Sequence, residues 1–316
     1  MTRAVRIGSF GGTEVLEVVE VPDPVAPDDG VVIEVRAAGV NPIDWKIREG
    51  RTATGPLTAP IGLGSDACGV VIAVGSEPGG FAVGDPVIAR GLTGAYASRV
   101  AAPSAGLTRK PPSMSFEEGA ALGTPAGTAY QSLKSLGVTS GETLLVHGGS
   151  GAVGLAAVQF AHHWGLTVVA TASLPHHARL AELGAIPVTY GDGLLERVRA
   201  VAPGGIDVAL DAAGTDEALR VSLDLVADRS RIATLVAFQA AAELGIGVFS
   251  EHFGAGLGVV GRALRQEGVA AAAYLAERGL FQIDIAGTYP LDQVAEAHRQ
   301  SQTGHVSGKI VLVPTP

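Results

Sequence analysis

Three closely spaced glycines are the residues whose spacing points most directly to chemistry. Gly149, Gly151 and Gly154 fit the pattern G-x-G-x-x-G, in which Ala152 and Val153 stand between the last two glycines. The apolar run TLLV precedes the pattern and the helix-like stretch LAAVQFAHHWG follows it. In such a turn one glycine allows the sharp bend, one lets the backbone approach a pyrophosphate, and one lets the helix pack closely on the strand. The pattern predicts dinucleotide binding, and the alternative is a glycine-rich turn without a ligand.

The residues after the second apolar run bear on which dinucleotide is bound. Sites for NAD usually have an Asp or Glu about 20 residues past the glycine turn, where it accepts hydrogen bonds from the ribose hydroxyls. None is present here, because the run ends in ATAS at Ser173 and the first carboxylate after it is Glu182. A 2′-phosphate could be bound by hydrogen bonds or charge from Ser173, His176, His177 and Arg179. We therefore predict NADPH as the cofactor, with a solvated basic helix start as the alternative.

The elements that position these residues are predicted from the order of apolar runs and turns. From Thr143 onward, apolar runs alternate with helix-like stretches, which indicates a parallel sheet with crossover helices. The run from Arg231 to Phe238 is expected to form an exposed edge strand of that sheet. Up to about Arg99 the chain has short β-type runs separated by Pro and Gly, which is typical of antiparallel structure. The tail is expected to form a helix from Gly268 to Arg278, a short β segment FQIDI, a helix from Leu291 to about Thr303 and a strand at Lys309 to Val313.

Composition and charge narrow the class of protein. The length of 316 residues suggests two domains, and the net charge of −9 argues against a dedicated nucleic-acid binder. Cys68 is the one cysteine, which excludes an internal disulfide and a four-cysteine zinc site and favours a reducing, cytoplasmic setting. The first residues show no secretory signal pattern. The uncharged stretch from Thr143 to Ala178 contains too many glycines and histidines to be expected in a membrane.

Motifs along nearly the whole chain carry a family resemblance. They are, in order, AAGVNPIDWKIREG, GSDACGVVIAVGS, FAVGDPVIAR, GAYASRVAAP, SFEEGAAL, GTPAGTAYQSL, LLVHGGSGAVGLAAVQFA, DAAG and GHVSGKIVLVP. In these motifs the chain resembles the zinc-independent quinone oxidoreductase branch of the medium-chain dehydrogenase/reductase superfamily. The resemblance implies an α/β fold, a doubly wound parallel Rossmann sheet plus a GroES-like β-barrel catalytic domain. It implies that residues 1–118 and 263–316 form the catalytic domain, that residues 119–262 bind the dinucleotide, and that cofactor and substrate lie in the cleft between them. It also implies a homodimer.

The same resemblance bears on metal binding. Zinc-dependent relatives have a cysteine where this chain has Asn41, and a Gly-His-Glu where it has Gly64, Ser65 and Asp66. No thiolate or imidazole remains at either position, and catalytic zinc needs three such protein ligands together with an open position. We therefore expect no metal site. Cys68, in a strand position usually filled by Ala, is interpreted as a small buried hydrophobe.

The expected catalytic residues are Lys46 and Asn41, both in or beside the motif NPIDWK. By resemblance Lys46 faces cofactor and substrate, where a cation would stabilise an enolate, and the alternative is a solvated lysine on a helix. Asn41 is expected to donate to the nicotinamide ribose or to the substrate carbonyl, and the alternative is a residue that stabilises the turn before Pro42. Resemblance also implies cofactor contacts from Thr128, Tyr190, Asp211, Val236, Phe238 and Lys309, although Lys309 is open to interpretation as an ordinary strand-edge lysine.

These observations predict an NADPH-dependent enzyme that reduces quinones or α,β-unsaturated carbonyls by hydride transfer without a metal. Such acceptors leave a delocalised enolate or quinol, so that the protein has mainly to position the reactants and stabilise an oxyanion. Two alternatives stay open. One is an enoyl reductase that acts in trans on carrier-tethered acyl chains, and the other is a non-catalytic NADP(H)-binding regulatory or structural protein.

Overall fold

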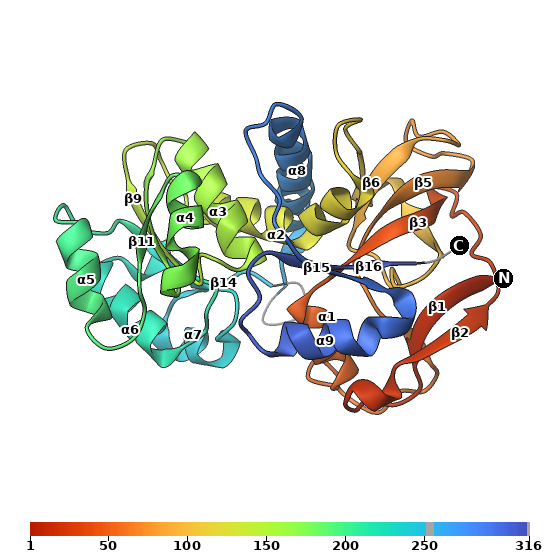
Figure 1. The fold of residues 1–316 in the computed structure, drawn as a ribbon, viewed down its shortest axis with the longest axis horizontal. Coiled ribbons are helices and arrows are strands. Elements are labelled where there is room, and N and C mark those ends of the chain that lie inside the picture. Colours follow the sequence, from red (N-terminus) through yellow and green to blue (C-terminus); the bar gives the residue numbers. More distant parts are fainter. Residues whose placement is uncertain (251–255, 315–316) are drawn as a thin grey trace. The chain divides into compact units, whose positions relative to one another are not determined.

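The computed structural model describes residues 1–250 and 256–314, and the chain divides into two compact units. The first unit combines Met1–Thr124 with Val269–Pro316, and the second comprises Pro125–Gly268 (Figure 1). The chain passes from one unit to the other within two long helices, α2 (Phe116–Ser135) and α8 (Gly258–Glu277). The domain boundaries expected from the sequence fall within the same two helices. That the two domains have catalytic and nucleotide-binding roles stays a prediction.

The first unit is built on two sheets, which confirms the antiparallel structure predicted for the N-terminal part. A three-stranded antiparallel sheet has the order β2-β1-β4, and a larger sheet has the order β15-β16-β3-β5-β6-β8, with β7 paired to β3. In the larger sheet only β15 and β16 pair in parallel. The strands are β1 (Thr2–Ile7), β2 (Glu17–Val21), β3 (Gly30–Val40), β4 (Ile61–Gly62), β5 (Asp66–Val74), β6 (Pro86–Arg90), β7 (Arg99–Pro103), β8 (Leu107–Arg109), β15 (Ile285–Pro290) and β16 (Lys309–Val313).

Two α-helices complete the first unit. Helix α1 (Pro42–Arg48) follows β3, and helix α9 (Val294–Gln302) packs on β15 and β16 (Figure 1). Short 3-10 turns are η1 (Thr13–Val15), η2 (Ser104–Gly106) and η5 (Leu291–Gln293). The core consists of buried aliphatic side chains from β1, β3, β5, β6, β7, β16 and α9. These strands and α9 therefore share one continuous apolar interior.

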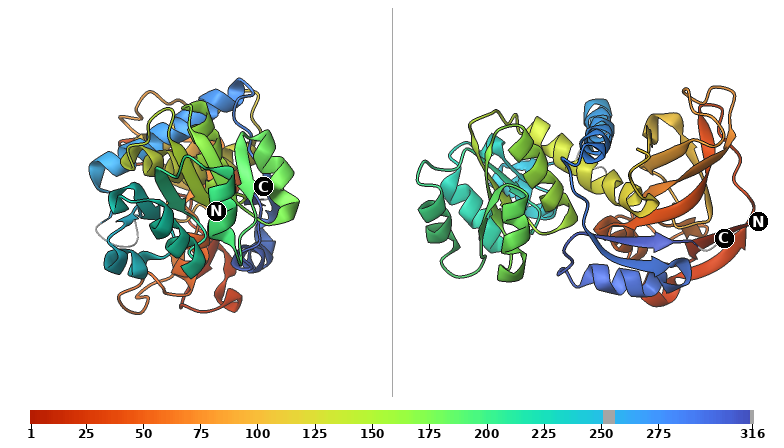
Figure 2. Two further views of the ribbon diagram at one scale, coloured as in Figure 1. Left: turned by 90° about the vertical axis from the view of Figure 1, so that its left-hand side faces the viewer. Right: turned by 45° about the horizontal axis from the view of Figure 1, so that its top comes forward.

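The second unit contains a parallel six-stranded sheet of order β11-β10-β9-β12-β13-β14, with helices on both faces (Figure 2). This is the alternation of strands and helices that the sequence predicts. The strands are β9 (Thr143–His147), β10 (Thr167–Thr171), β11 (Ala185–Val188), β12 (Val208–Asp211), β13 (Ile232–Thr234) and β14 (Gly247–Val248). The helices are α3 (Ala152–His163), α4 (His177–Glu182), α5 (Leu194–Val201), α6 (Asp216–Leu225) and α7 (Phe238–Leu244), with 3-10 turns η3 (Leu174–His176) and η4 (Arg229–Arg231).

The expectation of an edge strand from Arg231 to Phe238 is wrong. Strand β13 covers only Ile232–Thr234, and it has neighbours on both sides, because β14 pairs with it and forms the edge. Phe238 already belongs to α7. The edge strand has two residues, Gly247 and Val248, so it produced no apolar run that the sequence could reveal.

Two other expected boundaries in the tail are also wrong. Helix α8 begins at Gly258 and not at Gly268, because tertiary packing outweighs the low helix propensity of Gly258 and Gly261. The segment FQIDI is not a strand, since β15 begins at Ile285 and runs to Pro290. Ile285 pairs with Lys309, the first residue of β16, so the ladder between β15 and β16 begins at the last residue of FQIDI.

Other expectations concern single features. The capping box at the start of α2 is confirmed, because the Ser115 N–H donates to the Glu118 carboxylate at 2.7 Å and the Glu118 N–H donates to Ser115 Oγ at 3.0 Å. Cys68 is buried and unpaired, and burial raises the pKa of its thiol, as expected for a small hydrophobe. In the described part of the chain no helix is both long and apolar enough to cross a membrane.

Candidate functional site

The glycine turn lies at the carboxyl end of β9, where the chain leaves the parallel sheet and enters α3. Gly148 has a positive φ of 75°, a conformation that side chains disfavour. A Cβ at Gly154 would lie 2.2 Å from the carbonyl oxygen of Gly148, and a Cβ at Gly149 would lie 2.8 Å from the Ala170 side chain. These glycines are therefore required by the packing of the turn itself.

Gly151 differs from the glycines around it. A Cβ at Gly151 would meet only the Gly148 carbonyl oxygen, at an ordinary 3.5 Å, so packing within the protein does not require a glycine there. Gly151 is the N-cap of α3, and Ala152 and Val153 form the first turn, whose N–H groups have no partner within a helix. The turn thus leaves space where a backbone can come close to a pyrophosphate at a helix N-terminus. The residues present fit a dinucleotide.

The residues predicted to bind a 2′-phosphate follow β10. They differ in whether their side chains already bond to other groups of the protein. Ser173 is partly exposed. His177 Nε2 lies 3.2 Å from the Ala172 carbonyl oxygen, which leaves only its other ring nitrogen for a ligand. Arg179 forms an ion pair with Glu182 at 3.2 Å, one turn along α4. These residues follow the carboxyl end of β10, and their contact with a cofactor stays a prediction.

The loop after β11 is held by a residue that the sequence did not single out. Arg197 donates to three carbonyl oxygens in this loop, those of Thr189 (2.9 Å), Gly191 (2.8 Å) and Asp192 (2.6 Å). Tyr190, an expected cofactor contact, is 51% exposed in the same loop. The arginine sits on the amphipathic helix α5, where its sequence context is that of any surface residue. It fixes the backbone that presents Tyr190.

Asp211 ends β12 fully buried, and its carboxylate is occupied by the protein. Oδ1 accepts from the N–H groups of Ala213 (2.9 Å) and Gly214 (2.8 Å), and Oδ2 accepts from the Thr234 hydroxyl at 2.7 Å. The Thr234 oxygen in turn accepts from the Val236 N–H at 3.2 Å. Asp211 therefore joins the loops that follow β12 and β13, and Thr234, which the sequence analysis missed, is its partner.

Two expected cofactor contacts and one buried histidine also belong to this unit. Phe238 begins α7 and is half-buried, and Thr128 is buried in α2. His147, the last residue of β9, is 1% exposed, and its Nδ1 lies 3.5 Å from Thr171 Oγ. Burial lowers the pKa of His147 to about 4, so that the ring is neutral at pH 7. The sequence analysis did not single out His147.

The first unit contains a cluster of buried charged and polar side chains around Asn41. Its Nδ2 donates to Asp66 Oδ2 at 2.9 Å, and its Oδ1 accepts from the Lys309 ammonium group. Lys309 Nζ also lies 3.7 Å from Asp66 Oδ2. None of the three residues is more than 4% exposed. Asn41 and Lys309, expected separately from the sequence, are thus direct partners, and Lys309 is no strand-edge lysine in solvent.

Asp44 adds a second carboxylate to this cluster. Its Oδ2 accepts from the Asn41 N–H and from the Tyr96 hydroxyl, both at 2.7 Å. Burial raises the pKa of Asp44 to about 7, against the two hydrogen bonds, which lower it. The sequence analysis missed Asp44 and Tyr96, because neither has a motif of its own. We call Asn41, Asp44, Asp66, Tyr96 and Lys309 the buried cluster.

Lys46 lies on α1, two residues after Asp44 of the buried cluster. Its side chain is half-buried, with Nζ 5.6 Å from the centroid of the Trp45 ring. The Arg51 guanidinium lies 5.0 Å from the same ring. Burial, and secondly the charge of Arg51, lower the pKa of Lys46. Lys46 is therefore more enclosed than the solvated lysine considered as its alternative.

The side chains of the described residues determine whether a metal ion could be held. Among residues 1–250 and 256–314, no group of three or more His, Cys, Asp or Glu side chains could hold a metal ion. At the positions where zinc relatives have ligands, Asn41 offers an amide and Asp66 is engaged by Lys309. These residues do not fit a catalytic zinc.

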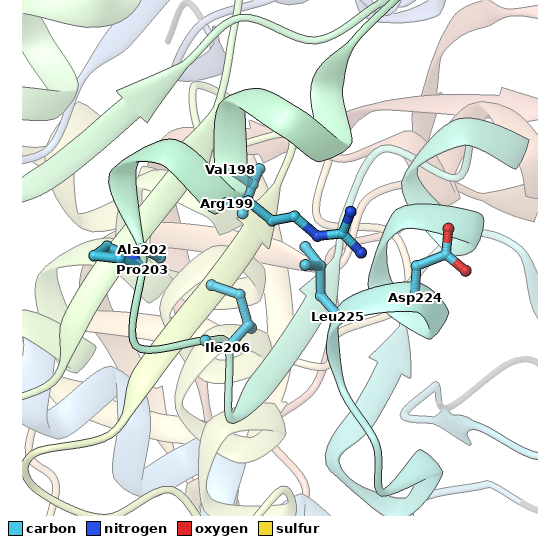
Figure 3. A pocket seen from close by; sticks show the side chains of 8 residues that line it. Val198, Arg199, Ala202, Pro203, Ile206, Asp224 and Leu225 are labelled. Carbon is cyan, nitrogen blue, oxygen red and sulfur yellow. The ribbon is translucent and has the colours of Figure 1, made fainter.

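A pocket of about 430 Å³ lies elsewhere in the second unit (Figure 3). Its lining comes from the end of α5, the loop before β12 and the end of α6. Arg199 extends from α5 in the direction of Asp224. The pocket is at the amino ends of the parallel strands, whereas ligands of such sheets bind at the carboxyl ends. It is therefore separate from the glycine turn.

Comparison with known proteins places these features in a family. Residues 27–112 match the family described as "Alcohol dehydrogenase GroES-like domain", and residues 183–312 match the family described as "Zinc-binding dehydrogenase". The chain is 32% identical to the quinone oxidoreductase of Homo sapiens, with 99% of this chain and 98% of that protein covered. It is 31% identical to the 2-methylene-furan-3-one reductase of Solanum lycopersicum, with 97% and 78% covered.

Solved structures give the same result. The Escherichia coli quinone oxidoreductase complexed with NADPH has a TM-score of 0.84 and 26% sequence identity, and the match covers 99% of this chain and 100% of the other. These findings confirm the fold class expected from the sequence, a parallel Rossmann sheet joined to a GroES-like N-terminal domain.

Proposed function

The chain belongs to the quinone oxidoreductase family of the medium-chain dehydrogenase/reductase superfamily, and from this we propose that it catalyses the NADPH-dependent reduction of quinones or α,β-unsaturated carbonyls by hydride transfer without a metal. The observation that supports this most directly is the turn at Gly151, which leaves room for a pyrophosphate on the Rossmann sheet. A quinone oxidoreductase relative has been solved with NADPH, and another relative is named for the reduction of an enone.

Preference for NADPH is supported by the carboxyl end of β10. No carboxylate stands between Ser173 and Arg179, so nothing there repels a 2′-phosphate. A charge-assisted contact to that phosphate contributes about 1.5 to 3 kcal/mol. The Arg179→Ala variant should therefore weaken NADPH and leave NADH nearly unchanged in a fluorescence titration of the two nucleotides. Equal or tighter binding of NADH by the unaltered protein would contradict the choice of cofactor.

In the proposed mechanism, residues of this chain bind the reactants and stabilise the negative charge that forms on the substrate. When bound, the nicotinamide supplies the hydride. Addition of that hydride to the β-carbon of an enone would move the electrons of the carbon–carbon double bond toward the carbonyl and place negative charge on the carbonyl oxygen. The Lys46 ammonium stabilises that oxyanion, and a proton from solvent completes the product. A half-buried cation does so better than a solvated one, because the lower local dielectric strengthens the attraction.

A metal is not needed for this chemistry. Oxidation of a simple alcohol requires a base or a metal to take the hydroxyl proton, whereas conjugated acceptors already delocalise the charge they receive. The engagement of Asn41 and Asp66 with Lys309 supports the same view, because it leaves these side chains unsuited to a cation.

Two other functions are tested by one experiment. Oxidation of NADPH and NADH is measured at steady state against quinones, enones, enals and enoyl thioesters. Turnover of quinones or enones with NADPH supports the proposal. Turnover confined to carrier-tethered enoyl thioesters would favour a trans-acting enoyl reductase. Tight NADPH binding without turnover of any acceptor would favour a non-catalytic nucleotide-binding protein.

A homodimer is also part of the proposal. Strand β14 ends the six-stranded sheet of the described residues, and pairing with a second copy would extend the sheet at that edge. Light scattering at micromolar concentration should give about twice the 31.9 kDa of one chain. The mass of a single chain would refute the dimer.

A further inference from the structure

The buried cluster gathers residues from distant parts of the chain onto the first turn of α1. Lys309 comes from β16, Asp66 from β5, and Tyr96 from the segment before β7. All three bond to Asn41 or Asp44, which are the N-cap and the third residue of α1. This is more than a short helix needs for its start, since one capping side chain satisfies a typical N-terminus.

The amide of Asn41 has only one favourable orientation. Its oxygen faces the ammonium of Lys309, and its nitrogen faces the carboxylate of Asp66 at 2.9 Å. Rotation of the amide by half a turn would set donor against donor and acceptor against acceptor. Such mismatches are costly in a buried site, where water cannot compensate. The two charges therefore fix the N-cap side chain.

Asp66 is itself held in place. Besides Asn41 and Lys309, the Thr124 N–H donates to its Oδ2 at 2.8 Å. A Cβ at Gly123 would lie only 2.4 Å from Asp66 Oδ1, so the carboxylate is packed directly against the backbone of α2. The Asp66 carboxylate thus has little freedom to move and serves as a fixed point for Asn41.

The other end of α1 is anchored as well. Arg48 is 1% exposed, and its guanidinium donates to the Gly11 carbonyl oxygen at 3.1 Å and to Gln302 at 3.3 Å. Its Nη1 lies 3.2 Å from His298 Nδ1 on α9. Because both ends of α1 are fixed, Trp45 and Lys46 between them occupy one place in the unit.

We propose that Lys309 and Asp66 are positioning residues that act through Asn41 on helix α1 and so set the place of Lys46. This inference rests on the proposed function for the role of Lys46, but not for the placement of α1. It assigns Lys309 to the protein's own framework and not to contact with the cofactor. Loss of either charge should let the first turn of α1 shift while the rest of the unit stays folded.

The first test uses Trp45 as a reporter and requires no activity. Trp45 and Trp164 are the two tryptophans of the chain, so the Trp164→Phe background leaves Trp45 as the one indole. In that background Lys309→Met and Asp66→Asn should each shift the Trp45 emission to the red and increase its quenching by acrylamide. The matched control is Lys110→Met, which removes a buried lysine of the same unit that donates to the Pro111 carbonyl oxygen and does not touch α1. It should leave Trp45 unchanged.

The second test separates positioning from cofactor contact. Lys309→Met should lower kcat for an enone by about 10- to 100-fold, because small misplacements of a catalytic group have effects of that size. In a Lys46→Met background it should lower kcat no further, since the group that it positions is then missing. NADPH affinity, measured by titration, should not change.

Three results would overturn the inference. They are unchanged Trp45 emission in folded Lys309→Met and Asp66→Asn variants, weakened NADPH binding by Lys309→Met, and additive losses in the double variant. Asp66→Asn removes the charge opposite Lys309 with little change in side-chain size, so it provides the answer if Lys309→Met does not fold. If the unaltered protein reduces no acceptor, the proposed function fails, whereas the Trp45 measurements still decide the inference.

Discussion

The glycine turn of the second unit and the buried cluster of the first unit differ in what their side chains do. At the turn, missing side chains leave backbone groups available to a ligand, and Gly151 has open space where a Cβ would stand. In the buried cluster, charged and polar side chains bond to one another, and none of the charged ones is more than 4% exposed. We propose that the first region receives a ligand and that the second holds its own residues in place. A charged side chain of this protein therefore cannot be assigned to ligand binding from its charge alone.

The largest expected effect comes from breaking the buried cluster. Asp66→Ala removes the carboxylate that lies 3.7 Å from the buried Lys309 ammonium, while Asn41 still accepts from it. Removing one partner of a buried pair costs about 3 to 5 kcal/mol, so the free energy of unfolding in urea should fall by that amount. Asp66→Asn, which keeps an acceptor, should cost less. A loss below about 1 kcal/mol for Asp66→Ala would mean that the cluster is open to water.

The next effect concerns Lys46, the charged residue beside the cluster that we assign to chemistry. Lys46→Ala should reduce turnover of a weak enone by about 100- to 1,000-fold, or about 2.7 to 4 kcal/mol, as for loss of an oxyanion donor. An electron-poor quinone should lose less, because its reduction needs less charge stabilisation. Full turnover of enones by this variant would remove Lys46 from the mechanism.

The dependence of stability on pH tests the raised pKa of Asp44. The pKa of Asp44 is about 7 in the folded protein, above its value in the unfolded chain, so the folded protein holds this proton more tightly. The resulting contribution to stability is complete at low pH and is lost as the pH rises toward 7. Asp44→Asn keeps an acceptor for Tyr96 without titrating. From pH 5 to pH 7 the variant should therefore gain about 2 to 3 kcal/mol relative to the unaltered protein, at 1.36 kcal/mol per pKa unit. A constant difference across this range, measured by urea unfolding, would contradict the assignment.

The smallest effect separates the glycines of the turn. Gly154→Ala forces a Cβ to within 2.2 Å of the Gly148 carbonyl oxygen, and overpacking of this kind costs about 1 to 3 kcal/mol of stability. Gly151→Ala should leave the unfolding free energy unchanged and weaken NADPH by about tenfold, or 1.4 kcal/mol. If Gly151→Ala bound NADPH as well as the unaltered protein, the open space at Gly151 would have no role in binding.

The two regions also differ in how far the sequence could predict them. The turn, its strand and its helix are local, so a pattern of six residues and its flanks was sufficient. The buried cluster joins Asn41 to Asp66 and to Lys309, 268 positions away, and no periodicity encodes such a meeting. Family resemblance suggested Asn41 and Lys309 but not that they bond to each other. Asp44 and Tyr96 had no signal at all.

Errors in the fold have the same cause. The two-residue strand β14 has no apolar run, so the sequence predicts the run that contains β13 as the edge of the sheet. Gly258 and Gly261 gave the first turns of α8 a low helix propensity in the sequence. Arg265 of this helix is buried and donates to the Phe249 carbonyl oxygen at 3.1 Å. In each case contacts distant in sequence decided a boundary that local propensity alone could not.

The central claim, reduction by NADPH without a metal, is tested most directly by nucleotide oxidation after exhaustive chelation. The protein is dialysed against a strong chelator, and NADPH and NADH oxidation is then followed with a quinone and with an enone. We expect undiminished turnover with both acceptors and a higher kcat/KM for NADPH than for NADH. Turnover that chelation abolishes and added zinc restores would contradict the account, as would the absence of turnover with either nucleotide.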